Sequence, residues 1–139
     1  MRILVPVDGS AGALRAVKHA AAMVKEGAEL QLVNVQPPMP LYGLVRAYMR
    51  APQYRAACET LSRRALDPAI RLLKRARVAH RTHVIYGEPG VTVADAARRL
   101  KCQAIVMGTR GQGAVGNLLL GSVATKVIHL AKVPVTLVK

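Results

Sequence analysis

Five short segments of aliphatic and β-branched residues alternate along this chain with longer segments whose apolar residues recur every three or four positions. The first pattern predicts buried strands, and the second predicts helices between them. Strands joined through helices run parallel, because the chain must cross back to the same end of the sheet. We therefore expect an α/β fold of one domain over residues 1–139: a doubly wound, Rossmann-like, five-stranded parallel sheet with helices on both faces. The predicted strands are Arg2–Val7, Glu29–Val35, His80–Tyr86, Ala104–Met107 and Val133–Val138.

Each predicted helix has an apolar stripe that should face the sheet. The first helix should begin after Ser10, its N-cap, and end at Gly27. Another helix should follow the turn at Gly87–Gly90, and the last should begin near Ser122. The predicted inward residues of these three helices are Leu14, Val17, Ala21 and Val24; Val93, Ala96, Ala97 and Leu100; and Val123, Val127 and Leu130.

The most basic part of the chain, residues 46–83 with a net charge of +8, contains a predicted long helix. Pro68 either kinks this helix or restarts it with Asp67 as the N-cap. A basic helix face is most often solvated surface, and that is our interpretation here. The apolar stripe consists of Cys58, Leu61, Ala65, Ala69, Leu72 and Ala76, and the opposite face carries Arg63, Arg64, Arg71, Lys74 and Arg75.

The whole chain has 21 Lys and Arg against 7 Asp and Glu, a net charge of +14. Nucleic-acid binding through Arg64, Arg71 and Arg75 is therefore one alternative function, with an affinity that would fall steeply with salt. However, Phe and Trp are absent and aromatic residues make up only 3% of the chain, so the stacking platforms of single-strand binders are missing. We do not expect a nucleic-acid partner.

The apolar runs are too short for a membrane span or a signal peptide. Ile3–Val7 ends at Asp8, far below the roughly 18 residues of a span and short of the roughly 7–15 of a signal peptide's apolar region. We expect a cytoplasmic protein that does not contact membranes. Cys58 and Cys102 lack CxxC or metal-ligand spacing, so we expect two buried thiols and no metal site.

A glycine-rich segment without acidic residues, 108–122, connects the fourth predicted strand to the last helix. Glycine lets the backbone approach a ligand closely, and a helix N-terminus presents unpaired N–H groups that suit an anion. The segment has neither the Gly-Lys-Ser or Gly-Lys-Thr of a Walker loop nor the GxGxxG spacing of dinucleotide folds. It predicts a phosphate-binding loop at the carboxyl end of the sheet, where doubly wound folds bind ligands.

Four separated segments, Ile3–Ser10, Ile105–Gly111, Leu120–Ala124 and Val133–Val135, occur in the order and setting of a known family. The glycines have that family's spacing: Gly108, two residues, Gly111, nine residues, then Gly121-Ser122. Through these residues the chain resembles the ATP-binding branch of the universal stress protein family along essentially its whole length. The resemblance implies a fold like that of the adenine nucleotide alpha hydrolases.

The resemblance also implies that ATP is the ligand. Asp8 would accept hydrogen bonds from the ribose hydroxyls, and apolar side chains would line an adenine slot. The glycine loop and the start of the last helix would hold the phosphates, mainly through backbone N–H groups, with the Ser122 hydroxyl either adding a donor or capping the helix. Magnesium stays an open question, because phosphates and water can supply most of its ligands. The implied nucleotide-binding residues are Pro6, Val35 and Met107 for the adenine, Asp8 and Gly108 for the ribose, Arg110, Gly111, Gly121, Ser122 and Val123 for the phosphates, and Val7 beside Asp8 with no subsite assigned.

The resemblance points to a nucleotide-dependent regulatory protein of stress adaptation. An adenine-nucleotide hydrolase or adenylating enzyme of the same fold is the alternative. Hydrolysis or transfer needs a general base or a metal-held water near the phosphates, and no carboxylate or histidine has an obvious position there; His129 lies about two turns beyond Ser122. Adenylating enzymes of this fold usually carry Ser-Gly-Gly-x-Asp-Ser after the first strand, whereas this chain has Asp8–Gly12. We therefore expect nucleotide binding with at most slow ATP hydrolysis.

The last predicted strand, Val133–Val138, is mostly apolar. An unpaired apolar edge favours association unless something covers it. In the family that the chain resembles, this strand pairs with its copy. We therefore expect a homodimer.

Overall fold

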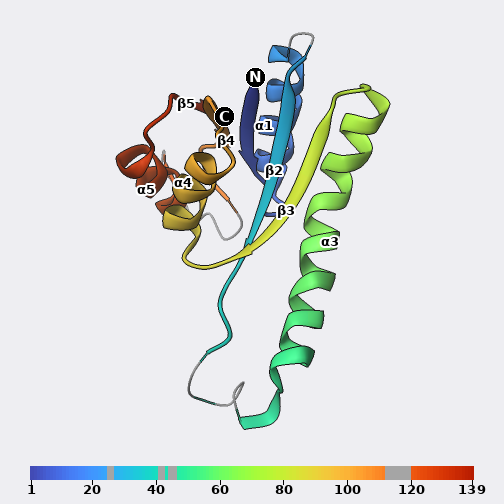
Figure 1. Ribbon diagram of the computed structural model, residues 1–139, viewed down its shortest axis with the longest axis vertical. Helices are drawn as coiled ribbons and strands as arrows, with labels where there is room; N and C mark the ends of the chain where they lie inside the picture. Colours follow the sequence, from blue (N-terminus) through green and yellow to red (C-terminus); the bar gives the residue numbers. More distant parts are fainter. Residues whose placement is uncertain (25–26, 41–42, 44–46, 112–119) are drawn as a thin grey trace.

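Five parallel strands and the helices that connect them make up the structure, a computed structural model that describes residues 1–24, 27–40, 43, 47–111 and 120–139 (Figure 1). The strand order is β3-β2-β1-β4-β5, and every pairing is parallel. The predicted α/β fold is confirmed. The strands are β1 (Arg2–Pro6), β2 (Glu29–Gln36), β3 (His80–Tyr86), β4 (Ala104–Gly108) and β5 (Val135–Val138), and the helices are α1 (Ala11–Met23), α3 (Ala51–Arg75), α4 (Pro89–Arg99) and α5 (Ser122–Leu130).

Strand boundaries differ from the predicted ones by at most two residues. The largest difference is in β5, which begins at Val135. The prediction began this strand at Val133, but Pro134 has no N–H to donate to a ladder. The Pro134 carbonyl still accepts the Ile105 N–H at 2.9 Å, so the chain reaches the sheet there and becomes a regular strand one residue later.

The strand order reverses between β1, the central strand, and its neighbour β4. After β1 the chain adds β2 and β3 on one side, and it then returns to add β4 and β5 on the other side. β1 and β4 are in register only at Ile3–Ala104 and Leu4–Ile105. A doubly wound sheet opens a crevice at such a reversal, outside the carboxyl ends of the strands. This crevice is where the sequence predicted a ligand site.

Two apolar cores lie on the two faces of the sheet. On one face α1 and α3 cover strand residues such as Val5, Leu32 and Val106. On the other face α4 and α5 cover residues such as Leu4 and Ile105. Figure 1 shows α4 and α5 together on one side of the strands and α3 on the opposite side.

The predicted apolar stripe of the basic helix is wrong in part: Cys58 and Ala69 are buried as predicted, but Leu61 and Ala76 are exposed. α3 runs without a break from Ala51 to Arg75, so Pro68 does not restart it, and Asp67 pairs with Arg71 instead of capping a new helix. Leu61 is 54% exposed, whereas its neighbour Ser62 is buried and donates a hydrogen bond to Asn34 Oδ1 at 2.8 Å. A polar residue with a buried partner therefore takes the inward position. The buried residues of α3 are Cys58, Ser62, Leu66, Ala69 and Leu73; of the other predicted inward residues Ala65 and Leu72 are half-buried and Ala76 is exposed.

The remaining helices follow the prediction more closely. α1 ends at Met23, earlier than the predicted end at Gly27, and its buried face is Gly12, Ala13, Ala16, Val17 and Ala20, with Leu14, Ala21 and Val24 half-buried. In α4, Val93, Ala96 and Ala97 are buried and Leu100 is half-buried. In α5, Val127 is buried and Val123 half-buried, but Leu130 is 41% exposed because Ala124 takes the second buried position.

Both cysteines are buried free thiols, as predicted. Within the described ranges, no helix is both long enough and apolar enough to cross a membrane.

The phase of α3 predicts opposite outcomes for two leucines on the same helix. Replacing fully buried Leu73 with Ala should lower the free energy of unfolding by about 2–5 kcal/mol, because it leaves a cavity. Replacing exposed Leu61 with Ala should change it by about 0.5 kcal/mol at most. Urea denaturation of both variants measures the two values. A larger loss for Leu61→Ala would mean that the predicted stripe, and not the observed one, faces the sheet.

Candidate functional site

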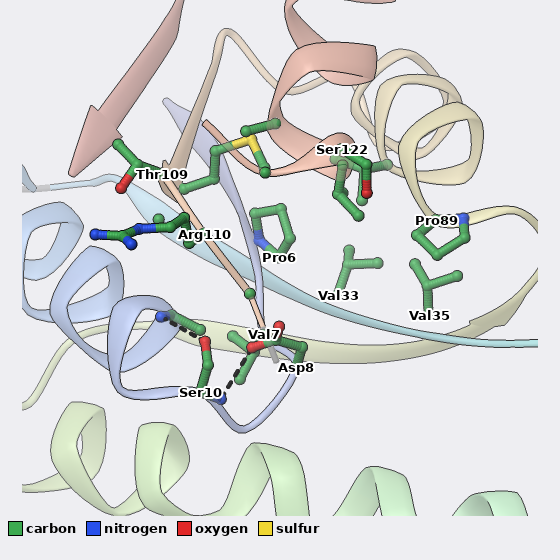
Figure 2. Close-up of a pocket in the computed structure, with 18 residues that line it drawn as sticks. Pro6, Val7, Asp8, Ser10, Val33, Val35, Pro89, Thr109, Arg110 and Ser122 are labelled. Carbon is green, nitrogen blue, oxygen red and sulfur yellow. Dashed lines mark hydrogen bonds between the residues drawn. The ribbon is translucent and has the colours of Figure 1, made fainter. Parts of the chain in front are cut away.

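A cleft of about 470 Å³ lies at the reversal of strand order, beyond the carboxyl ends of β1 and β4 (Figure 2). The structure brings all eleven sequence-predicted site residues to its walls: Pro6, Val7, Asp8, Val35, Met107, Gly108, Arg110, Gly111, Gly121, Ser122 and Val123. The lining also includes residues that the sequence analysis did not assign to a site, which are Ser10, Ala13, Val33, Pro89, Val93, Thr109 and Ala124. Val33 could have been predicted from Val35, because side chains two residues apart on a strand lie on the same face of the sheet.

The walls of the cleft differ in chemistry. Pro6, Val33, Val35 and Pro89 lie together on one side in Figure 2, with no polar side chain labelled between them. Asp8 and Ser10 lie below them in that view, Thr109 and Arg110 lie across the cleft, and Ser122 lies above. An apolar slot beside a set of hydrogen-bonding groups is the arrangement of a small-molecule site.

The turn after β1 is held by its own hydrogen bonds. The Ser10 N–H donates to Asp8 Oδ1 at 2.9 Å, and Gly9 has a φ of +85°, which favours glycine. Ser10 Oγ accepts the Ala13 N–H at 3.1 Å, so Ser10 caps α1 as predicted. One carboxylate oxygen of Asp8 therefore serves the turn, and the other lies beside Gly111 of the glycine loop.

Glycines let the turn after β1 approach the loop after β4. A Cβ on Gly111 would collide with Asp8 Oδ2. A Cβ on Gly12 would lie 2.9 Å from the Arg110 carbonyl oxygen, and one on Gly108 would lie 3.0 Å from the Gly12 carbonyl carbon. These distances are shorter than normal carbon contacts, so the two segments touch only because side chains are missing. Gly12 was not predicted, because its place in a helix gave no sign of a distant contact.

Gly121 has a different environment. The nearest atoms to a Cβ at this position would be Arg110 Cα and the Thr109 carbonyl oxygen, both at 3.5 Å, which is ordinary contact. The Gly121 N–H donates to the Thr109 carbonyl at 2.7 Å, and the Thr109 N–H donates to the Val138 carbonyl at 3.0 Å. Among the described residues, a side chain at position 121 would therefore meet only ordinary contacts.

The N-terminus of α5 supplies donors to the cleft. Gly121, and not Ser122, is the N-cap, and the first intrahelical bond of α5 runs from the Thr125 N–H to the Gly121 carbonyl. The N–H groups of Ser122, Val123 and Ala124 thus belong to the first turn, which has no intrahelical acceptor. All three residues line the cleft. The suggestion that Ser122 caps the helix is corrected, since it is the first helical residue and is exposed.

Asp8 and Arg110 are the ionisable side chains in the described lining. The strand histidines have partners elsewhere: His80 Nδ1 lies 2.9 Å from the Val78 carbonyl oxygen, and His83 Nε2 lies 2.8 Å from Gln31 Oε1. Burial lowers the pKa of His83, and the positive charge of Arg81 lowers it further. Within the part of the chain that the structure describes, no three His, Cys, Asp or Glu side chains gather as a metal site would require.

Comparison with known proteins gives a consistent result. The model of the universal stress protein family matches residues 1–139. A universal stress protein of Thermus aquaticus is 36% identical over 99% of this chain and 97% of its own length. The structure of the universal stress protein from Archaeoglobus fulgidus in complex with dAMP is 26% identical, with a TM-score of 0.72 over 100% of this chain and 98% of that chain. A universal stress protein in complex with cAMP is 25% identical, with a TM-score of 0.69 over 100% and 97% of the two chains.

The glycine contacts predict a reversal of the usual effect of alanine in a helix. Gly to Ala in a helix interior normally stabilises by roughly 0.5–1 kcal/mol, but Gly12→Ala should lower the free energy of unfolding by about 1–3 kcal/mol, because backbone must move. Gly121→Ser is the matched control: it meets no close atom of the described residues and keeps a favoured N-cap, so its effect should stay within about 0.5 kcal/mol. Chemical denaturation checks both, and stabilisation by Gly12→Ala would show that the two segments do not touch.

Proposed function

The chain belongs to the universal stress protein family, and from that premise we propose that it binds an adenine nucleotide, ATP, in the cleft between β1 and β4. The observation that supports this most is the composition of one cleft: an apolar slot, a carboxylate, a glycine loop and a helix N-terminus meet there. Binding of dAMP and cAMP by the two structural relatives supports an adenine nucleotide as the ligand class.

The base would occupy the apolar slot. Pro6, Val35 and Met107, joined by Val33, offer flat or branched aliphatic surface on which a purine can lie. Asp8 would accept hydrogen bonds from the ribose hydroxyls while its Oδ1 keeps the Ser10 N–H. Val7 and Gly108 would border the sugar, because they flank the opening between β1 and β4.

The phosphates would extend toward the glycine loop and α5. The first-turn N–H groups of Ser122 and Val123, with those around Gly111 and Gly121, form a surface for anionic oxygens. Arg110 lies on the same wall through its backbone, and in Figure 2 its guanidinium points away from Ser122 and the apolar slot. Such an extended donor surface suits a chain of phosphates better than a single one, which is our reason to favour ATP over AMP.

We propose a regulatory role in stress adaptation and no catalytic one. In the described lining Asp8 is the single carboxylate, and its turn already uses one of its oxygens. A magnesium ion bound with ATP would therefore take most of its ligands from phosphate and water. ATP occupancy would set which proteins the chain contacts in the cytoplasm.

We also propose that the protein is a homodimer formed through β5. This strand is an edge of the sheet, pairs with β4 alone among the described strands, and is half-buried along its whole length. An edge strand of Val, Thr, Leu and Val leaves backbone donors and acceptors open to a second copy.

Gly121→Val should separate binding from folding. Among the described residues the substitution meets only ordinary contacts, but it places a branched side chain where phosphate would approach backbone. ATP affinity should fall about tenfold or more, because hydrogen bonds to charged groups are lost. Titration calorimetry measures the affinities for ATP, AMP and GTP. Ile128→Val, on the exposed surface of α5 and outside the described cleft lining, is the control that should bind as the wild type does. Undiminished ATP binding by Gly121→Val would remove the phosphate assignment.

Light scattering tests the dimer. At micromolar concentration the mass should be twice the 14.9 kDa of one chain. A monomer mass would contradict pairing through β5.

A further inference from the structure

Three polar side chains are buried between β2 and α3, just beneath the turn that carries Asp8. Asn34 and Ser62 are 3% and 1% exposed, and Gln36 is 9% exposed. Polar groups in such a place are costly unless all of them are hydrogen-bonded. In the described part of the chain no buried side-chain nitrogen or oxygen lacks a partner, so this group forms a satisfied network.

Asn34 is the centre of the network. Its Nδ2 donates to the Val7 carbonyl oxygen at 2.7 Å, and its Oδ1 accepts from Gln36 Nε2 and from Ser62 Oγ, each at 2.8 Å. The orientation of the Asn34 amide follows from chemistry, because a backbone carbonyl can only accept. The NH2 group must therefore face Val7, and the oxygen must face the two donors.

The bond to Val7 fixes the peptide that leads into Asp8. The Val7 carbonyl and the Asp8 N–H belong to one planar peptide unit, so holding the carbonyl sets the direction in which the chain enters Asp8. The Val7 N–H is also bound, to the Val33 carbonyl at 2.8 Å. β1 ends at Pro6, so the Val7 carbonyl lies beyond the regular strand, at the edge of the cleft. The Asn34 side chain bonds this carbonyl to β2.

We propose that Asn34 is a positioning residue for the nucleotide site: through the Val7 carbonyl it aims the Asp8 carboxylate at the ribose hydroxyls. This inference rests on the proposed function. In this role Asn34 does not itself contact the nucleotide. It acts on the sugar, because its side chain lies on the α3 face of β2, whereas Val33 and Val35 line the slot from the opposite face of that strand. The donors of α5 belong to another element. Its loss should therefore weaken recognition of the ribose and leave recognition of the base and phosphates unchanged.

The test compares ATP with 2′,3′-dideoxy-ATP, which lacks the hydroxyls that Asp8 would bind. Wild-type protein should prefer ATP. Asn34→Leu, which cannot hold the Val7 carbonyl, should weaken ATP binding about tenfold, the value of a hydrogen bond to a charged group. Binding of dideoxy-ATP should change by less than about twofold, because that ligand lacks the affected contact. Asn34→Val, a strand-forming residue with no side-chain donor, carries the same expectation if Asn34→Leu does not fold.

Ser62→Ala is the matched control. It removes one partner of Asn34 from the same buried network but leaves the bond to Val7, so it should destabilise the fold and keep the preference for ATP. In a double-mutant cycle, Asn34→Leu added to Asp8→Ala should cost no further ATP affinity.

Three results would overturn the inference while the proposed function stands. They are an equal loss of affinity for both nucleotides in Asn34→Leu and Asn34→Val, a full ATP preference in those variants, and wild-type protein that binds both nucleotides equally. Wild-type protein that binds neither nucleotide would instead reject the proposed function.

Discussion

The close approach of two backbone segments organises this protein. The turn after β1 and the loop after β4 leave neighbouring strands at the point where the strand order reverses, and they touch through Gly12, Gly108 and Gly111. Without these contacts the crevice would be an open gap between two independent loops. With them, Asp8 lies against the glycine loop, and the loop's ends are tied to α5 and β5 through Thr109. Elements far apart in the chain can thus form one site, because these glycines have no side chains to keep them apart.

Much of the fold and the site follows from the sequence, because both depend on local patterns. Alternating strands and helices fix a parallel sheet, and a glycine loop that follows a strand can only lie at its carboxyl end. All predicted site residues line one cleft for that reason. What escaped prediction depends on partners distant in sequence. Ser62 faces inward because Asn34 receives its hydrogen bond, and Gly12 is required because Arg110 lies against it. Neither of these contacts can be predicted from the local spacing of residues along the chain.

The excess positive charge is distributed unevenly between the two helix layers. α3 has six basic residues against Glu59 and Asp67, and its one ion pair in the described structure is Arg71 with Asp67. On the other face, Asp95 of α4 pairs with both Arg98 and Arg99. The exposed arginines of α3 lie on the helix that also buries Ser62 beneath the cleft turn. A polyanion such as ATP could therefore bind weakly to α3 by charge alone, and affinity by itself does not identify the site.

Amide chemical shifts during an ATP titration separate these two modes of binding most directly. If ATP binds in the cleft, a ¹H–¹⁵N spectrum at physiological salt should show saturable shifts at Asp8, Gly108, Gly111 and the first turn of α5. The amides of α3 should not shift, apart from residues beneath the turn that carries Asp8. Nucleotide in the cleft must perturb these amides because they line it. Shifts centred on Arg64, Arg71 and Arg75 that disappear as salt increases would contradict binding in the cleft. They would show that the protein binds ATP only through its charge.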